Sequence, residues 1–217
     1  MNKIASFYTS SVGRKLLMGL SGFFLLSFLV VHLYINLFLL KQDRGSTFDT
    51  YAEFMATYPL IRPLEIVLFA GFLLHAFVGG WLWLTNRMAR PVRYAVNRAS
   101  ENSTLSSRTA FWTGAFVLLF LVIHVNTFFV RSRFFPDGTT MYERVEDAFR
   151  SPLYVCFYLV ALAFLGYHLK HGVQSAFQTL GLKHAKYERI IAAIGVVFWL
   201  LFPLGFAVLP LYFLLAH

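Results

Sequence analysis

Four of the chain's seven histidines lie in strongly apolar segments and recur at nearly constant spacings. His32 and His124 are 92 residues apart, and His75 and His168 are 93 residues apart. Imidazole nitrogens bind metals, and ionisable side chains at membrane depth are costly and usually functional. The paired spacing therefore predicts two sites, each built from two imidazoles that come from different segments of the chain.

Two of these histidines end segments of nearly the same sequence. Residues 20–32 read LSGFFLLSFLVVH and residues 112–124 read WTGAFVLLFLVIH, with seven of thirteen positions identical. We interpret this likeness as an internal repeat, in which a two-helix unit is written twice and a fifth helix is added. The two units would cover about 12–90 and about 104–181, and the fifth helix about 190–216.

The composition indicates how these segments are positioned. Of the 217 residues, 58% are hydrophobic and only 13% are charged. About 20 apolar residues at 1.5 Å each cross the hydrocarbon of a bilayer. The apolar runs that reach this length are Leu16–Leu40, Leu64–Thr85, Ala110–Val130, Leu153–Leu180 and Ile190–Ala216. The sequence therefore predicts an all-α, polytopic membrane protein with five transmembrane helices in a single domain over 1–217, the first four helices forming a bundle.

The single cysteine, Cys156, excludes an intrachain disulfide and a cysteine-ligated cluster within this chain. We expect Cys156 to be a small packing residue. The first apolar run is too long for a cleaved signal peptide, so we expect it to remain as the first span.

The charges of the connecting segments are divided unevenly between the two ends of the predicted bundle. We call side A the end at which the first span begins, and side B the opposite end. Side A carries twelve basic and two acidic residues, and side B seven basic and eight acidic residues. Because basic loops stay in the cytoplasm, we expect a multi-pass protein of the inner (cytoplasmic) membrane with a cytoplasmic N-terminus and its C-terminus on side B. The net charge of +9 then reflects the orientation of the chain in the membrane. We therefore expect membrane lipid and no nucleic acid as a partner. The basic face can also dock a soluble protein.

Depth in the membrane decides which histidines can meet. His32 and His124 lie about sixteen and fourteen residues along helices that start on side A, so both are nearer side B. His75 and His168 lie about eleven and fifteen residues along helices that start on side B, so both are nearer side A. Two facing imidazoles are the ligand set of a bis-histidine haem iron, whereas zinc needs three or four ligands at one level. The sequence therefore predicts two haem groups.

A glycine lies beside each of the two histidines nearer side A. His75 precedes Gly79 by four residues, and His168 precedes Gly172 by four. Residues four apart share a helix face, so each glycine leaves room for a flat macrocycle next to its histidine. The sequence has no Cys-x-x-Cys-His segment, so the haem groups are expected to be b-type and not covalently attached.

His171 is the rival ligand in the fourth helix, three residues after His168. We favour His168 because it alone repeats the histidine-to-glycine spacing of the second helix. His184, in a side-A loop, and His217, the last residue, are expected to be solvated.

Three further residues are candidates for holding haem propionates through charge-assisted hydrogen bonds. Arg131 follows His124 by seven residues, two turns along the same helix, while His171 and Ser175 follow His168 by three and seven residues. An alternative for Arg131 is a boundary residue whose guanidinium reaches the membrane interface.

Five spans, histidines paired between spans one and three and between spans two and four, and HLKHGVQSAFQTLG at 168–181 resemble a known family. It is the dihaem cytochrome b membrane anchor of succinate:quinone oxidoreductases, the succinate dehydrogenases and fumarate reductases with one large anchor subunit. The resemblance covers essentially the whole chain. It implies that His32 and His124 hold the haem b nearer side B, and that His75 and His168 hold the haem b nearer side A.

The resemblance also implies partners. A flavoprotein and an iron–sulfur subunit would dock on side A, and a quinone, often menaquinone, would react near the side-B haem. This chain would transfer electrons between them, as the quinone-reacting subunit of the enzyme, while succinate chemistry would occur on another chain.

Two family features concern carboxylates. Some fumarate reductases of this type have a glutamate two residues before the fourth-helix ligand, which serves transmembrane proton transfer. Gly166 holds that position here, so that pathway is not carried over. A glutamate near the quinone is also a family feature, and Glu53 and Glu65 are both candidates for proton exchange. Either glutamate can instead pair with Arg62 or Arg44.

We expect the quinone pocket on side B, under the segment 41–65. Phe54, Met55 and Tyr58 would form its walls, Arg62 would supply a cation, and one of the two glutamates would exchange protons. Two alternatives remain for the whole chain: a dihaem anchor of another respiratory dehydrogenase of the hydrogenase, formate or nitrate type, or a transporter that uses buried histidines as a relay.

Overall fold

The computed structural model describes residues 10–89 and 103–216, and every regular element in these ranges is helical. Five helices are long and apolar enough to cross a membrane: Ser11–Leu40, Ile61–Met88, Leu105–Phe134, Pro152–Thr179 and Ala185–Ala216. These spans confirm the five predicted runs, and all but the fourth are longer than expected by several residues.

The first, third and fifth spans contain more than one helical element. The first is α2 (Ser11–Asn36) with η1 (Leu37–Leu40), and the second is α4 (Ile61–Met88). The third is α6 (Leu105–His124), η2 (Val125–Val130) and α7 (Arg131–Phe134), and the fourth is α9 (Pro152–Thr179). The fifth is η3 (Ala185–Tyr187), α10 (Glu188–Val196), η4 (Val197–Leu201) and α11 (Phe202–Ala216).

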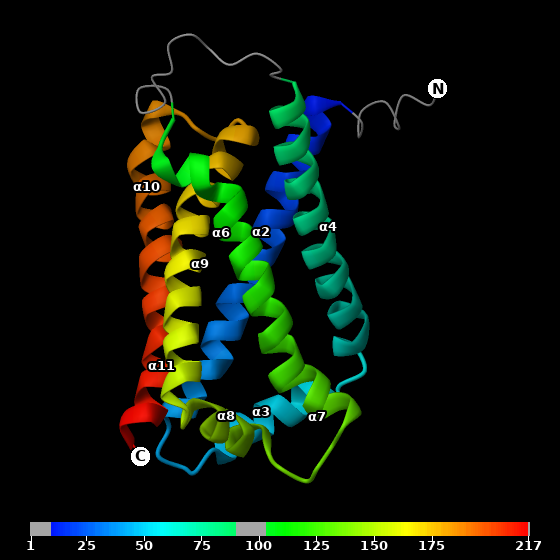
Figure 1. Ribbon diagram of the computed structural model, residues 1–217, viewed down its shortest axis with the longest axis vertical. Helices are drawn as coiled ribbons and strands as arrows, with labels where there is room; N and C mark the ends of the chain where they lie inside the picture. The colour runs from blue at the N-terminus through cyan, green and yellow to red at the C-terminus, as the bar shows by residue number, and fades with distance from the viewer. Residues whose placement is uncertain (1–9, 90–102, 217) are drawn as a thin grey trace.

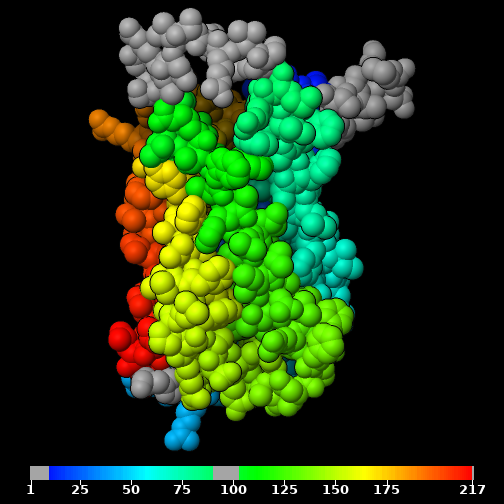
Figure 2. All heavy atoms as spheres, in the orientation of Figure 1, coloured from blue at the N-terminus to red at the C-terminus, as the bar shows by residue number. Residues whose placement is uncertain are grey.

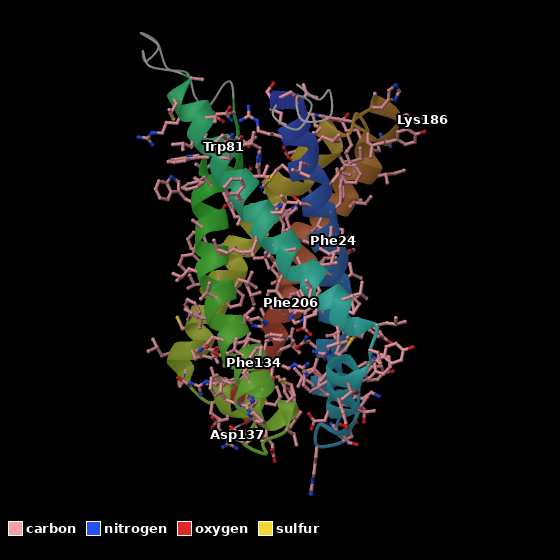
Figure 3. All side chains as sticks on the ribbon, turned by 90° about the vertical axis from the view of Figure 1, so that its right-hand side faces the viewer. Phe24, Trp81, Phe134, Asp137, Lys186 and Phe206 are labelled. Carbon is pink, nitrogen blue, oxygen red and sulfur yellow. The ribbon has the colours of Figure 1, made fainter. Side chains whose placement is uncertain are left out.

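The spans alternate in direction (Figure 1). The start of α2, the end of α4, the start of α6 and the end of α9 lie at one end, which is side A, and the end of α11 lies at the other. Trp81 and Lys186 lie towards side A, and Phe134 and Asp137 towards side B (Figure 3). The up-and-down order is therefore as predicted. Several side-A charges used for the orientation, Lys3, Arg90, Arg93, Arg98 and Glu101, lie outside the described residues.

The helix ends follow local sequence signals. The hydroxyls of Ser10 and Thr104 accept hydrogen bonds from the first turns of α2 and α6, and Ser151 caps α9. At the other end of α9, Gly181 has a φ of +71°. Its N–H donates to the carbonyl of Gln178, and the N–H of Leu182 donates to the carbonyl of Phe177. This is a Schellman motif, in which a glycine with positive φ ends the helix.

Side B is covered by two short amphipathic helices, α3 (Ser46–Thr57) and α8 (Met141–Phe149). Helix α8 begins with a capping box between Thr140 and Glu143. The backbone N–H of Tyr142 donates to Asp49 Oδ1 at 2.8 Å, which ties α8 to α3. In the turn before α8, hydrogen bonds from Thr139 and then Arg144 hold the pKa of the exposed Asp137 below its usual range.

The largest buried cluster lies under this cover. Its members are Leu39, Phe48, Val145, Phe149, Val155, Tyr158, Leu209 and Phe213. Helix α9 is central to the fold, since it packs against α2, α6 and α11. Helix α4 is peripheral, with Val78 as its one buried residue. Figure 2 shows the face made by α9, α6 and α4. Cys156 is exposed on α9, so the expectation that it is a packing residue was wrong.

The fifth span departs from α geometry just before Pro203. Proline has no N–H, so the carbonyl of Trp199, four residues earlier, lacks its helical partner, and the π segment η4 lies at this point. A Cβ added to Gly166 would lie 2.6 Å from that carbonyl oxygen. Gly166 therefore lets α9 and η4 approach closely. Pro210 lies inside α11 without ending the helix.

Candidate functional site

The structure places the four intramembrane histidines in two pairs. His32 of α2 and His124 at the end of α6 have ring centroids 5.7 Å apart and ring planes at 85°. His75 of α4 and His168 of α9 have ring centroids 6.2 Å apart and ring planes at 81°. These are the pairs that the depth argument predicts, and each joins two helices that run in the same direction.

The two pairs lie at different depths. A Cβ on Gly22 of α2 would lie 3.5 Å from the His75 ring, and a Cβ on Gly114 of α6 would lie 2.9 Å from the His168 ring. Each glycine precedes the side-B histidine of its own helix by ten residues. At 1.5 Å per residue, the two levels are about 15 Å apart along the bundle.

The repeated thirteen-residue segment therefore serves both levels. Its third residue, Gly22 or Gly114, forms the wall beside a side-A histidine, and its last residue is a side-B histidine. The second residue of the segment also contacts a side-A histidine. Ser21 Oγ lies 3.1 Å from His75 Nδ1, and Thr113 Oγ1 lies 3.5 Å from His168 Nδ1.

The Nδ1 atom of each histidine faces a polar partner. Besides these two hydroxyls, the carbonyl oxygen of Ala110 lies 3.3 Å from His168 Nδ1. On side B, Tyr158 Oη lies 2.9 Å from His124 Nδ1, and the Asn36 amide makes a longer 3.5 Å contact with His32 Nδ1. Over residues 10–89 and 103–216, none of the four Nε2 atoms has a hydrogen-bond partner.

For His75, His124 and His168, whose Nδ1 atoms face oxygens, this arrangement suits a metal held by Nε2; His32 Nδ1 faces the amide nitrogen of Asn36 instead. Histidines that ligate metals commonly donate their other ring N–H to a neighbouring oxygen, which fixes the tautomer and the ring orientation. Metal–imidazole bonds of about 2 Å place the centroids of two rings on opposite sides of one ion about 6 Å apart. The centroid distances of 5.7 and 6.2 Å fit this value.

The number of ligands at each level restricts the kind of metal. Among the described residues, no group of three or more histidine, cysteine, aspartate or glutamate side chains could hold a metal ion. A zinc site of the usual kind is therefore not formed there. Two imidazoles per level fit an iron whose other four ligands come from a macrocycle.

The glycines on the ligand faces differ in the space beside them. A Cβ on Gly172 would meet no atom within 4 Å, so this position is open as expected. A Cβ on Gly79 would lie 3.3 Å from Met18 Cε, the end of a flexible side chain. Gly172 therefore has the room for a flat group that the sequence predicts, whereas the Met18 side chain occupies the space beside Gly79.

The structure favours His168 over His171 as the partner of His75. Within the described part of the chain, the His75 ring has a contact with His168 and none with His171. His171 and Ser175 are partly exposed on α9, towards side A from this pair. Their predicted role as propionate partners stays a prediction. His184 is exposed and caps η3, as expected for a solvated residue, whereas His217 lies outside the described residues.

Arg131 does not lie on the helix stripe that was expected. The segment between His124 and Arg131 is the π helix η2, whose wider turn changes the angular register. The seven-residue spacing therefore does not place the two residues on one stripe, and the predicted role of Arg131 as a propionate partner stays a prediction. Arg131 is exposed and lines an open hollow of about 310 Å³ on side B with Asn126, Val130, Phe135 and Asp137.

The two glutamates of the predicted quinone pocket have different surroundings. Glu65 forms an ion pair with Arg62 at 2.7 Å, and the same guanidinium also binds the carbonyls of Met55 and Ala56 at the end of α3. Glu65 thus pairs with Arg62, which was the alternative to a role in proton exchange. Glu53 is exposed on α3 and has no ion pair with a described residue.

The predicted pocket walls form an exposed aromatic pair. The rings of Phe54 and Tyr58 are stacked with centroids 4.9 Å apart, and their exposed fractions are 46% and 43%. They lie at the side-B end of the bundle, where α3 meets α4.

Sequence reasoning did not single out the residues around the histidines. Tyr158 and Asn36 gave no signal, since neither belongs to a repeated pattern. Ser21 and Thr113 could have been found from the sequence, because a small hydroxyl residue precedes the glycine in both copies of the repeat. Phe206 of the fifth span was also missed, although its ring lies 5.6 Å from the His32 ring, near the middle of the bundle's length in Figure 3.

Comparison of the chain with protein-family models, with curated proteins and with solved structures found no match. The functional conclusion therefore depends on the geometry of the two histidine pairs and on the resemblance seen in the sequence.

Proposed function

We propose that the chain is a dihaem cytochrome b that anchors a succinate:quinone oxidoreductase in the membrane and carries electrons between its soluble subunits and a quinone. The observation that carries this proposal is the pairing of His32 with His124 and of His75 with His168. The Nδ1 atoms of His75, His168 and His124 each lie within hydrogen-bond distance of an oxygen, and among the described residues the Nε2 atoms of both pairs are left for a ligand.

The chain's own residues have clear tasks in this function. Haem b supplies one-electron redox chemistry when it is bound. The four histidines hold the irons through Nε2, while Ser21, Ala110 and Tyr158 orient the imidazoles through Nδ1. Gly172 provides space beside the side-A pair. The spans keep the two levels about 15 Å apart along the bundle, and so define a route from side A to side B.

The internal two-helix repeat supports two equivalent sites. Ser21 on α2 contacts His75 on α4, and the equivalent Thr113 on α6 contacts His168 on α9. The sequence separations of these contacts are 54 and 55 residues. We infer that α2 with α4 and α6 with α9 are the two copies of one helical hairpin, and that the four helices form the haem-binding bundle.

The ends of the bundle suit different partners in this proposal. The flavoprotein and the iron–sulfur subunit dock on the basic side A, where Arg14, Lys15, Arg87 and Arg108 lie near the helix ends. The quinone reacts on side B near the His32–His124 pair. Stacked Phe54 and Tyr58 offer an apolar surface there, and exposed Glu53 offers a carboxylate for proton exchange.

The test is a haem analysis of the protein purified from membranes together with whatever subunits remain bound. Pyridine haemochrome analysis is expected to give two b-type haem groups per chain. A result below about one haem per chain would reject the dihaem function and leave a histidine-relay transporter as the better reading. Co-purification of a flavoprotein that oxidises succinate separates this anchor from those of hydrogenases, formate dehydrogenases and nitrate reductases.

A further inference from the structure

One histidine of the side-B pair belongs to a longer hydrogen-bonded chain. Tyr158 Oη lies 2.9 Å from His124 Nδ1 and 3.3 Å from Tyr154 Oη. Tyr154 in turn donates to Thr127 Oγ1 at 3.1 Å. Thr127 lies three residues after His124, in the π segment η2. The chain of hydroxyls therefore leaves α6, passes through α9 and returns to the same span.

The order of donors in this chain is fixed once His124 binds a metal through Nε2. Its Nδ1 then carries the proton and donates to Tyr158 Oη. The Tyr158 hydroxyl donates to Tyr154, which is already a donor to Thr127. Each of the two tyrosines accepts one hydrogen bond and donates the next, and such chains are cooperative in a low-dielectric interior.

Tyr158 is held so that its hydroxyl cannot easily turn away. The side chain is 6% exposed and belongs to the largest buried cluster. Its ring makes edge contacts with Phe120 at 4.8 Å and Phe149 at 5.0 Å between centroids. Removal of the hydroxyl alone therefore leaves the ring packing in place.

Within residues 10–89 and 103–216, the other side-B histidine has no comparable partner. His32 Nδ1 has only the 3.5 Å contact with the Asn36 amide, whose nitrogen also donates to the His32 carbonyl at 2.7 Å. The hydroxyl chain therefore acts on one ligand of the side-B pair.

We propose that Tyr158 is a positioning residue for the side-B site: it orients His124 and, by accepting its Nδ1–H, makes that imidazole a stronger electron donor to the metal. This inference rests on the proposed haem function. A more basic axial ligand stabilises the oxidised iron. Removal of the hydroxyl should therefore favour the reduced state of the side-B haem.

The experiment compares Tyr158→Phe with the unchanged protein in an anaerobic redox titration of the haem spectra. A net hydrogen bond corresponds to about a two- to tenfold change in an equilibrium constant. At a fixed ambient potential, the reduced-to-oxidised ratio of the side-B haem is expected to rise by about this factor, and that of the side-A haem to stay unchanged. Spectra of His124→Ala identify which component belongs to side B.

Three further variants complete the design. Tyr154→Phe removes the next link and is expected to shift the same haem in the same direction by less. Ser21→Ala removes the acceptor of the His75 Nδ1–H and is expected to shift the side-A haem instead. Tyr34→Phe, at a tyrosine that is 60% exposed on α2, is expected to shift neither haem.

The outcomes separate this inference from the proposed function. Two haem groups with unchanged reduced fractions in Tyr158→Phe would overturn the role of Tyr158 and leave the dihaem function standing. Absence of haem from the unchanged protein would reject the function itself. Selective loss of the side-B haem in Tyr158→Phe would support the positioning role. If Tyr158→Phe loses both haem groups, Tyr154→Phe is the test instead. A shift of the side-B haem alone in Tyr154→Phe would support the positioning role, and no shift would overturn it.

Discussion

The two histidine levels each contain a pair of facing imidazoles, but the surroundings of the two pairs are very different. Around the side-A pair lie small residues, with Gly22 and Gly114 against the imidazole rings and hydroxyl groups at Nδ1. Around the side-B pair lie aromatic rings, namely Phe28 and Phe206 beside His32, and Phe120, Phe128 and Tyr158 beside His124.

This difference shows that the repeat preserves only part of each site. Both walls of the side-A level come from equivalent positions of the two repeats, so that level is symmetrical. The side-B level is not, because the fifth span contributes Phe206 to His32 while Tyr158 of α9 contacts His124. The added helix therefore makes the two ends of the bundle unequal.

The most direct way to break the comparison is to remove one ligand at a time. We expect His124→Ala to lose the side-B haem and His168→Ala to lose the side-A haem, each variant keeping about one of two. His171→Ala is expected to keep both, because its ring does not contact His75. Haem content and the spectrum of each purified variant give the answer. Loss of a haem in His171→Ala, with retention in His168→Ala, would reverse the assignment in α9.

Helix α9 offers a matched pair of glycines that separates packing from ligand space. In Gly166→Ala the new Cβ would lie 2.6 Å from the backbone oxygen of Trp199, so α9 and η4 must move apart. Overpacking of this kind costs about 1–3 kcal/mol. Thermal unfolding of the detergent-solubilised protein is expected at a lower temperature for Gly166→Ala.

Gly172→Ala is the control for this pair and tests a separate point. No atom lies within 4 Å of its added Cβ, so the stability of the haem-free chain should not fall. The side-A haem should bind less well, because the methyl group takes up space beside His168. Equal stability and equal haem content in both variants would contradict the packing argument for α9.

The symmetry of the side-A level can be tested with its two wall glycines. A Cβ on Gly114 would lie 2.9 Å from the His168 ring, whereas a Cβ on Gly22 would lie 3.5 Å from the His75 ring, which is ordinary contact. Gly114→Ala is therefore expected to disturb the side-A haem spectrum, and Gly22→Ala to leave it nearly unchanged. The side-B spectrum serves as the internal reference in both variants. A larger effect of Gly22→Ala would mean that the pair is arranged differently when it is loaded.

The smallest expected effect concerns the two covering helices on side B. In Asp49→Ala the N–H of Tyr142 loses its acceptor, and a net hydrogen bond contributes about 0.5–1.5 kcal/mol. A modest fall in thermal stability is expected, with both haem spectra intact, since neither residue contacts a histidine. Glu143→Ala, which removes half of the capping box of α8 without touching α3, is the matched control. A change in the side-B haem spectrum of Asp49→Ala would show that the cover shapes that level.

Much of the site could be predicted from the sequence. The five spans follow from apolar runs, which are local composition, and the depths of the four histidines follow from the helix rise per residue. The pairing of His32 with His124 follows from depth. Both helices start on side A, so residues at similar distances from the helix start lie at similar depths in the membrane. The expected stripe from His124 to Arg131 failed for a physical reason. A stretch of six residues, Val125–Val130, adopts a π turn, and nothing in VNTFFV distinguishes it from α helix.

The sequence by itself determined the all-helical class, the five spans, their alternating direction and the four histidines with their depths, since each of these depends on residues close together in the chain. Only the tertiary structure decided which atoms face the imidazoles. Tyr158 reaches His124 across 34 positions and Ser21 reaches His75 across 54, and such contacts depend on how helices rotate about their axes when they pack. That rotation is set by the close approach of whole helix faces, as at Gly166 and Trp199, which no local pattern encodes.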